Sequence, residues 1–258
     1  MNSAQVLRQD IRRGAHSGLT TGRAPGFVQA NLTLLPANHA DDFLKFCELN
    51  PAACPVLGVS KRGAFDLPTL ADDLDVRTDL PGYLVHRTGQ PPLAVPDLGA
   101  VWRDDLVAVA TGCWFSVEDA LADAGIRLRH RELGLQGPLF KTNRETTRVG
   151  LFGGPLVVSM RPFADADVAA VKRLTSNFPQ AHGAPLHEGD AAALGITDLL
   201  APDFGEVLLP LPGETPLFWA CGLTAMVALQ QSGLPFFITH APGQMLVTDL
   251  RCDAQAVE

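Results

Sequence analysis

The sequence has 258 residues, 47% hydrophobic and 19% charged, and a chain of this length buries about 70–75% of its unfolded surface. This composition excludes a disordered chain. Twenty Lys and Arg against 28 Asp and Glu give a net charge of −8 without a sustained basic cluster, so neither nucleic acid nor an anionic membrane is an expected partner. Because no apolar run reaches the roughly 20 residues of a membrane helix, and the first thirty residues lack the apolar stretch of a signal peptide, we expect a cytoplasmic protein.

The cysteines are odd in number and widely spread: Cys47, Cys54, Cys113, Cys221 and Cys252. No pair has the Cys-x-x-Cys spacing of zinc or redox sites. We therefore expect reduced thiols and no metal or other cofactor.

Gly and Pro divide the first half of the chain into short elements. A short helix is expected within residues 1–18, and apolar residues recur at helical spacing from Asn38 until Asn50, which precedes a proline. The apolar runs at 55–59 and 83–86 predict buried strands. Residues 104–110 are interpreted as a helix.

The next segment is predicted to form a small α+β module. Ser116 begins a capping-box pattern for a helix that ends at Gly125. Strands are expected near 138–141 and at 156–160. A helix with one apolar face follows from Asp165 up to Pro179.

The C-terminal part predicts a β-α-β unit. Its strands are 216–220 and 235–239, and Thr224 is the expected N-cap of the intervening helix. Strands joined in this way are nearly always parallel, so both would end at one edge of a sheet. The loops that begin at Cys221 and His240 would then converge.

This convergence is the first candidate site. Cys221 and His240 could form a thiolate–imidazole pair. The helix beginning near Gly222 and Thr224 offers free N–H groups to a carboxylate. The alternative is that Cys221 is a small buried hydrophobe and His240 a turn residue.

The second candidate is the loop with His182, His187 and Asp190. These side chains could bind a divalent ion, although their spacing matches no known zinc motif. We favour acid–base work by a histidine over a metal. Asp190 also suits the N-cap of a short helix over 191–194.

The third candidate is the glycine-containing loop 19–27. Arg23 could clasp a carboxylate, with Thr21 and the backbone N–H groups adding hydrogen bonds. The alternative, a turn with Arg23 in a surface ion pair, fits equally well.

Polar residues also lie beside two apolar runs. Asn143 ends one predicted strand, and Ser159 and Arg161 flank Met160 on another. Each could line a cleft, although charges in such places are usually solvated.

Several motifs, taken together in order, resemble the hydro-lyase family that includes mitochondrial D-glutamate cyclase. They are Gly-Leu-Thr-Thr-Gly-Arg-Ala-Pro-Gly-Phe at 18–27, Asn-Pro-x-x-Cys-Pro-Val-Leu at 50–57, Arg-Thr-Asp-Leu-Pro-Gly-Tyr at 77–83, Trp-Arg-Asp-Asp-Leu-Val at 102–107, Val-Ser-Met-Arg-Pro at 158–162, His-Gly-Ala-Pro at 182–185, Phe-Trp-Ala-Cys-Gly at 218–222 and Ile-Thr-His-Ala-Pro-Gly at 238–243. The match spans about residues 18–249. Trp114, Glu188 and Gln244 depart from the family pattern.

The resemblance implies a two-domain protein of the α/β class. One domain, from 1–113 and 185–258, would be a three-layer α/β/α unit with a mixed, partly parallel sheet. A smaller two-layer α+β domain would be inserted into it, and the strand–helix pattern alone places this domain at about 114–184. The implied activity is that of a hydro-lyase, which converts D-glutamate to 5-oxo-D-proline and water or acts on a related small amino or carboxylic acid. A homo-oligomer is compatible with this interpretation.

A working mechanism follows from the candidate residues. Arg23 and the helix N-terminus after Gly222 would hold the α-carboxylate, and Arg161 or Asn143 would orient the γ-carboxyl. His240 and His182 would transfer the two protons.

Cys221 would donate a hydrogen bond in this scheme or form a transient thioester. Three alternatives stay open: a Cys221–His240 amidohydrolase, a metal-assisted dehydratase using His182, His187 and Asp190, and a non-catalytic binder of small acids.

Overall fold

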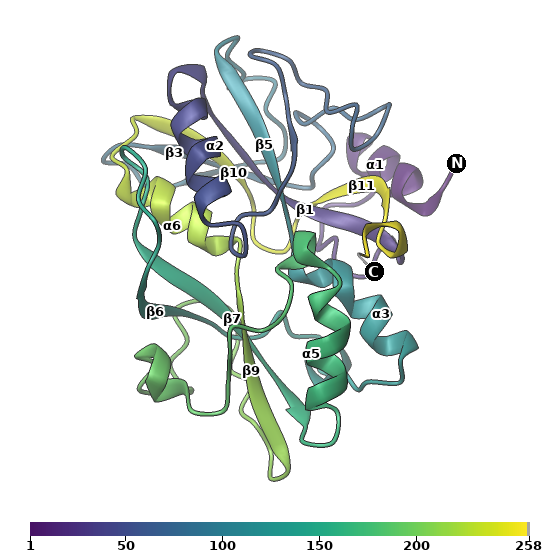
Figure 1. Cartoon of the computed structure of the whole chain (residues 1–258). Coiled ribbons are helices and arrows are strands. Elements are labelled where there is room, and N and C mark those ends of the chain that lie inside the picture. Colours follow the sequence, from purple (N-terminus) through teal and green to yellow (C-terminus); the bar gives the residue numbers. More distant parts are fainter. Residues whose placement is uncertain (257–258) are drawn as a thin grey trace.

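The computed structural model describes residues 1–256, which fold around two antiparallel sheets (Figure 1). The first sheet has the order β2-β5-β1-β10-β3-β4, and β11 also pairs with β1. Its seven strands are β1 (Phe27–Pro36), β2 (Val56–Val59), β3 (Tyr83–Arg87), β4 (Leu93–Val95), β5 (Leu106–Gly112), β10 (Phe236–His240) and β11 (Leu246–Arg251).

The second sheet has the order β6-β7-β9-β8 and lies below the first in Figure 1. Its strands are β6 (Leu139–Glu145), β7 (Pro155–Ala164), β8 (His187–Glu188) and β9 (Glu214–Ala220). The α-helices of the described residues are α1 (Ser3–Arg12), α2 (Ala40–Leu49), α3 (Glu118–Asp123), α4 (Arg129–Glu132), α5 (Val168–Ser176) and α6 (Leu223–Gln231).

The two faces of the first sheet are covered differently. On β1, Leu34 packs against Leu67 of the irregular segment between β2 and β3. Leu35, on the opposite face, packs with Phe43 of α2 and Leu229 of α6, as the alternation of side chains along a strand requires. Helices α2 and α6 therefore cover one face and the irregular segment covers the other. Because all the strand pairs are antiparallel, the expected partly parallel sheet is wrong, and the three-layer α/β/α arrangement is not confirmed.

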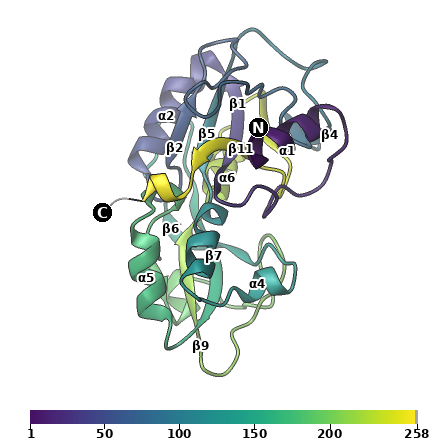
Figure 2. The same cartoon turned by 90° about the vertical axis from the view of Figure 1, so that its right-hand side faces the viewer.

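The second sheet forms a two-layer unit with helices on one face. Phe163 of β7 and Trp219 of β9 pack with Val171 of α5 and Leu121 of α3 in a separate core cluster. Figure 2 shows α5 alongside this sheet. The strand β9 lies outside the segment 114–184, so the second sheet draws on more of the chain than that range. The division into domains stays a prediction.

The expected β-α-β unit does not form. Strand β9 pairs with β7 and β8, whereas β10 pairs with β1 and β3, all antiparallel. Helix α6 connects the two sheets, because Ala225 belongs to the core beneath the first sheet and the Thr224 hydroxyl bonds the backbone of Val157 on β7. The predicted helix over 104–110 is also wrong, because residues from Leu106 onward form the fully buried strand β5, which lies between β2 and β1.

Helices α2 and α5 and the strands at 56–59, 83–87 and 155–164 confirm the elements predicted for those segments. The strand at 56–59 is mostly exposed, however, and not buried as expected. Two expected caps are wrong. Ser116 bonds the backbone of Gln29 rather than the first turn of α3, and Gly222, not Thr224, is the N-cap of α6.

Asp190 does cap the 3-10 helix Ala191–Leu194, as expected. Within residues 1–256, no helix is long and apolar enough to cross a membrane.

Candidate active site

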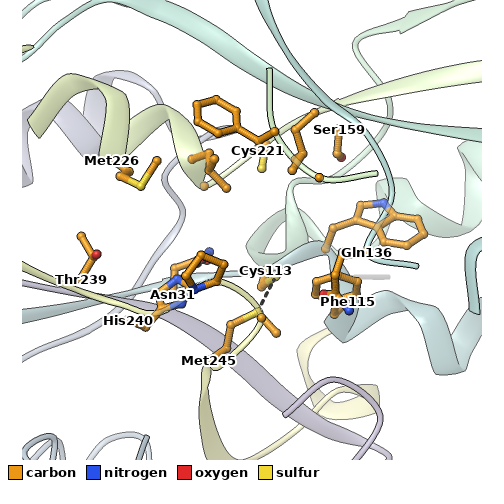
Figure 3. A pocket seen from close by; sticks show the side chains of 18 of the residues that line it. Asn31, Cys113, Phe115, Gln136, Ser159, Cys221, Met226, Thr239, His240 and Met245 are labelled. Atoms are coloured by element: carbon orange, nitrogen blue, oxygen red, sulfur yellow. Dashed lines mark hydrogen bonds between the residues drawn. The ribbon is translucent and has the colours of Figure 1, made fainter. Parts of the chain in front are cut away.

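A cavity of about 450 Å³ lies between the two sheets. The first sheet contributes residues of β1, β5 and β10, and the second contributes β7 and the turn after β9. Figure 3 shows Ser159 and Cys221 on one side of this space and Asn31, His240 and Met245 on the other. The site is therefore built where the sheets face each other.

Arg161 is the buried cation of the cavity. Its side chain is 3% exposed and extends from β7. Nη1 donates to the carbonyl oxygen of Met160 at 2.8 Å, and Nη2 donates to that of Gln136 at 2.6 Å. In the described part of the chain Arg161 forms no ion pair and its Nε has no hydrogen-bond partner. Burial lowers the pKa of Arg161, but a guanidinium stays protonated.

Two further polar atoms on the cavity lining lack a partner among the described residues. They are Ser159 Oγ and Trp114 Nε1. The guanidinium carbon of Arg161 lies 5.0 Å from the centre of the Trp114 ring. These side chains are buried, so neither atom can exchange its missing protein partner for bulk solvent.

His240 lies at the end of β10 between two oxygen atoms. Its Nδ1 is 2.8 Å from the carbonyl oxygen of Ala241, and its Nε2 is 3.1 Å from Oδ1 of Asn31. The amide nitrogen of Asn31 donates to the carbonyl oxygen of Gly112 at 2.8 Å, which fixes the amide orientation. Only the doubly protonated imidazole can satisfy both oxygens. Burial opposes that charge and lowers the pKa of His240.

His182 also lines the cavity and is the one described non-glycine residue with positive φ, at 77°. Its Nδ1 lies 2.8 Å from the carbonyl oxygen of Ala52, so Nδ1 carries the proton in the neutral ring. Burial lowers the pKa of His182 to about 4. At neutral pH it is a free base whose lone pair is on Nε2.

Cys221 and His240 reach the same cavity, but the thiolate–imidazole pair does not form. Both ring nitrogens of His240 bond elsewhere. Burial raises the pKa of Cys221 to about 11 and that of Cys113 to about 12. Both are protonated thiols at neutral pH, and Cys113 contacts the sulfur of Met245 at 3.5 Å.

Several predicted site residues lie elsewhere. Arg23 is exposed, as is Asn143, and neither lines the cavity. Thr21 does not line the cavity, and its hydroxyl donates to Oε1 of the lining residue Gln136 at 3.3 Å. Gly222 does line the cavity, and a Cβ there would approach Asn31 Nδ2 to 2.4 Å. Thr224 connects α6 to β7 instead of facing a ligand.

The expected metal alternative also fails geometrically. His187 Nε2 bonds the backbone oxygen of Asp190, whose carboxylate caps a helix, while His182 bonds Ala52. Across the described residues, no group of three or more His, Cys, Asp or Glu side chains could hold a metal ion.

Gln136 and Glu206 line the cavity together with Asn31 but were not predicted as site residues, whereas Asn31 was expected in an amide-rich loop rather than on a strand. Glu206 accepts from the backbone N–H of Gln136 and Gly137 at the rim. The alternation of polar and apolar residues over 27–36 could have identified β1, and with it the inward position of Asn31. Gln136 and Glu206 lie in irregular loops and have no such signal.

The fold and cavity define a class of protein with two antiparallel sheets and a cavity between them, lined by a buried arginine and two histidines. The profile of the D-glutamate cyclase family matches residues 107–249. The chain belongs to this family.

Curated relatives span nearly the whole chain. A protein of Burkholderia multivorans named "Putative hydro-lyase" is 53% identical, covering 97% of this chain and 96% of its own length. Proteins with the same designation from Jannaschia sp. (50% identity, 98% and 95% coverage) and Pseudomonas aeruginosa (51% identity, 95% and 92% coverage) are also similar.

A solved structure titled as a nitrogen repressor-like protein of Methanococcus jannaschii matches with a TM-score of 0.39 and 9% identity over 92% of this chain and 91% of that one.

Proposed function

We propose that the protein is a hydro-lyase that closes D-glutamate to 5-oxo-D-proline and releases water. The observation that carries this proposal is Arg161, a buried guanidinium on a largely apolar cavity that makes no direct ion pair in residues 1–256, since Glu118 and Glu206 act on it only at longer range. A buried charge normally has a counter-charge. An anionic substrate would supply it, and the family match supports an amino acid with two carboxyl groups.

The reaction needs two protons to pass from the amino nitrogen to the departing oxygen. The α-amino nitrogen attacks the γ-carboxyl carbon, a C–N bond forms and a C–O bond breaks. Two protons leave the nitrogen and depart with the oxygen as water. Because both reacting groups belong to one molecule and the five-membered ring is nearly unstrained, holding them in contact contributes much of the acceleration.

His182 serves as the proton acceptor in this proposal. It is unprotonated at neutral pH, and the carbonyl oxygen of Ala52 holds the proton on Nδ1. Nε2 is therefore the atom that can take a proton from the substrate.

His240 serves as the proton donor to the leaving oxygen. The oxygens of Asn31 and Ala241 hydrogen-bond its charged form at both nitrogens. A bound carboxylate would offset the burial that disfavours this charge. Because hydroxide is a poor leaving group, such an acid lowers the barrier for C–O cleavage.

Incubation of the protein with D-glutamate and with L-glutamate, followed by chromatography of 5-oxoproline, tests the proposal. We expect product from the D-enantiomer above a protein-free control, and none above that control from a His182→Asn, His240→Gln double variant. Binding of glutamate without product from either enantiomer would overturn the proposal in favour of a non-catalytic binder.

A further inference from the structure

Among the described residues, three unpartnered hydrogen-bonding atoms belong to residues that line one cavity. Within residues 1–256, five buried side-chain nitrogen or oxygen atoms lack a partner, and three of them are Trp114 Nε1, Ser159 Oγ and Arg161 Nε. All three residues line the cavity. Such atoms are rare in folded proteins because an unmade buried hydrogen bond costs about 1–3 kcal/mol. Their concentration here points to a ligand that completes them.

The three side chains are close to one another. Ser159 and Arg161 lie two positions apart on β7, so their side chains extend from the same face of the strand. The Trp114 ring lies against the Arg161 guanidinium, with 5.0 Å between the guanidinium carbon and the ring centre. Together they form one wall of the cavity.

This wall is held rigidly. The two terminal nitrogens of Arg161 are anchored to Met160 and Gln136, and a Cβ at Gly137 would come within 2.6 Å of Nη1. The Trp114 ring packs against Trp219 and His130 with ring centres 5.4 and 5.6 Å away. A rigid donor set binds its ligand with little loss of side-chain entropy.

We propose that Trp114 Nε1, Ser159 Oγ and Arg161 Nε form a subsite for the α-carboxylate, the group that substrate and product share. The assignment rests on the proposed function. A carboxylate is the ligand that fits, because it offers about four lone-pair sites to donors and carries the charge that Arg161 lacks.

The γ-carboxyl is the poorer fit for this subsite. It must lose an oxygen, and donors that stabilise it equally before and during the reaction would not accelerate that loss. The subsite therefore holds the α-carboxylate in place, while the histidines transfer protons to and from the amino nitrogen and the γ-carboxyl.

Calorimetric titration with 5-oxo-D-proline, which has a single carboxylate, tests the subsite. Trp114→Phe keeps most of the ring and removes the N–H, and Ser159→Ala removes the hydroxyl. Each should weaken binding about 10-fold or more, as expected for a hydrogen bond to a charged group. Trp102→Phe and Ser176→Ala, which change the same residue types outside the cavity, should bind like the wild type.

A second ligand, 2-pyrrolidinone, has the same lactam ring without the carboxylate and should bind the wild type and the two subsite variants equally. Unchanged affinity of both subsite variants for 5-oxo-D-proline would overturn the assignment. If Trp114→Phe does not fold by circular dichroism, Ser159→Ala decides alone.

The two proposals fail separately. Loss of 5-oxo-D-proline affinity in the subsite variants, without turnover of glutamate by the wild type, would retain the subsite and remove the cyclase. Turnover of D-glutamate by the wild type, with unchanged affinity of the subsite variants for 5-oxo-D-proline, would retain the cyclase and remove the subsite.

Discussion

The amide oxygen of Asn31 lies 3.1 Å from Nε2 of His240, although 209 positions separate the two residues. Strands β1 and β10 are neighbours in the first sheet and bring them together. Because Gly112 fixes the Asn31 amide and Ala241 accepts from Nδ1, His240 gains a hydrogen bond each time it takes up a proton. The pairing of β1 with β10 therefore helps to set whether His240 is charged in the cavity.

Asn31→Asp is therefore expected to raise the pKa of His240. The substitution places a negative charge beside Nε2, and an opposite charge at this range shifts a pKa by about one to three pH units. Titration of the histidine Cε1–H signals by NMR measures the effect, with His240→Gln identifying the resonance. A His240 pKa equal to that of the wild type would show that the two side chains do not interact in solution.

His182→Asn should remove part of the acid sensitivity of the fold. Burial lowers the pKa of His182 to about 4 from an ordinary 6.5, so between these values the unfolded chain binds more protons and unfolding becomes easier as pH falls. The wild type should lose about 3 kcal/mol from this residue between pH 6.5 and pH 4. Asn tolerates the positive φ of this position, so the variant should fold.

Urea denaturation of both proteins at several pH values measures this difference. His86, His130 and His240 also have lowered pKa values but are common to both chains, so they cancel. Parallel stability curves from pH 7 to pH 4 would contradict a neutral buried His182.

The spacing of apolar residues and the residues that end a helix were sufficient to predict α2 and α5. Helices α2 and α5 have apolar residues on one face and clear ends, and the structure confirms both. The helix predicted over 104–110 is wrong for β5, because a continuous apolar run has no period that separates a helix from a strand. The seven buried residues of β5 lie between β1 and β2, a pairing set by distant segments.

The site illustrates the same limit. Cys221 and His240 do meet at one cavity, although the predicted reason, two parallel strands ending at one edge, is wrong. The turns after β9 and β10 converge because each sheet presents one of them to the space between the sheets. Which sheet a strand joins depends on long-range pairing, and no motif in 214–243 encodes it.

Thr224→Val should destabilise the fold without changing ligand affinity. The hydroxyl accepts from the Val157 N–H at 3.0 Å and donates to its carbonyl oxygen at 3.3 Å, and the residue is 1% exposed. Leaving the N–H unpaired costs about 1–3 kcal/mol. Chemical denaturation should show this loss, and Thr224→Ser should recover most of it. A stable variant with weakened 5-oxo-D-proline binding would instead place Thr224 in the ligand site.

Cys221→Ala should retain most of the turnover of the wild type. With a pKa of about 11, only about one Cys221 in a thousand is a thiolate at pH 8, and the thiolate is the nucleophilic form. The histidine that could activate it bonds Asn31 and Ala241 instead.

Iodoacetamide should accordingly modify Cys221 slowly at pH 8, with the rate rising about tenfold for each pH unit. Mass spectrometry of the modified peptide, together with the rate of 5-oxoproline formation, measures both effects. Rapid alkylation of Cys221 at neutral pH, accompanied by loss of turnover and by an inactive Cys221→Ala variant, would instead establish a thiolate nucleophile. The mechanism would then proceed through a thioester, formed on the γ-carbon before the amine attacks.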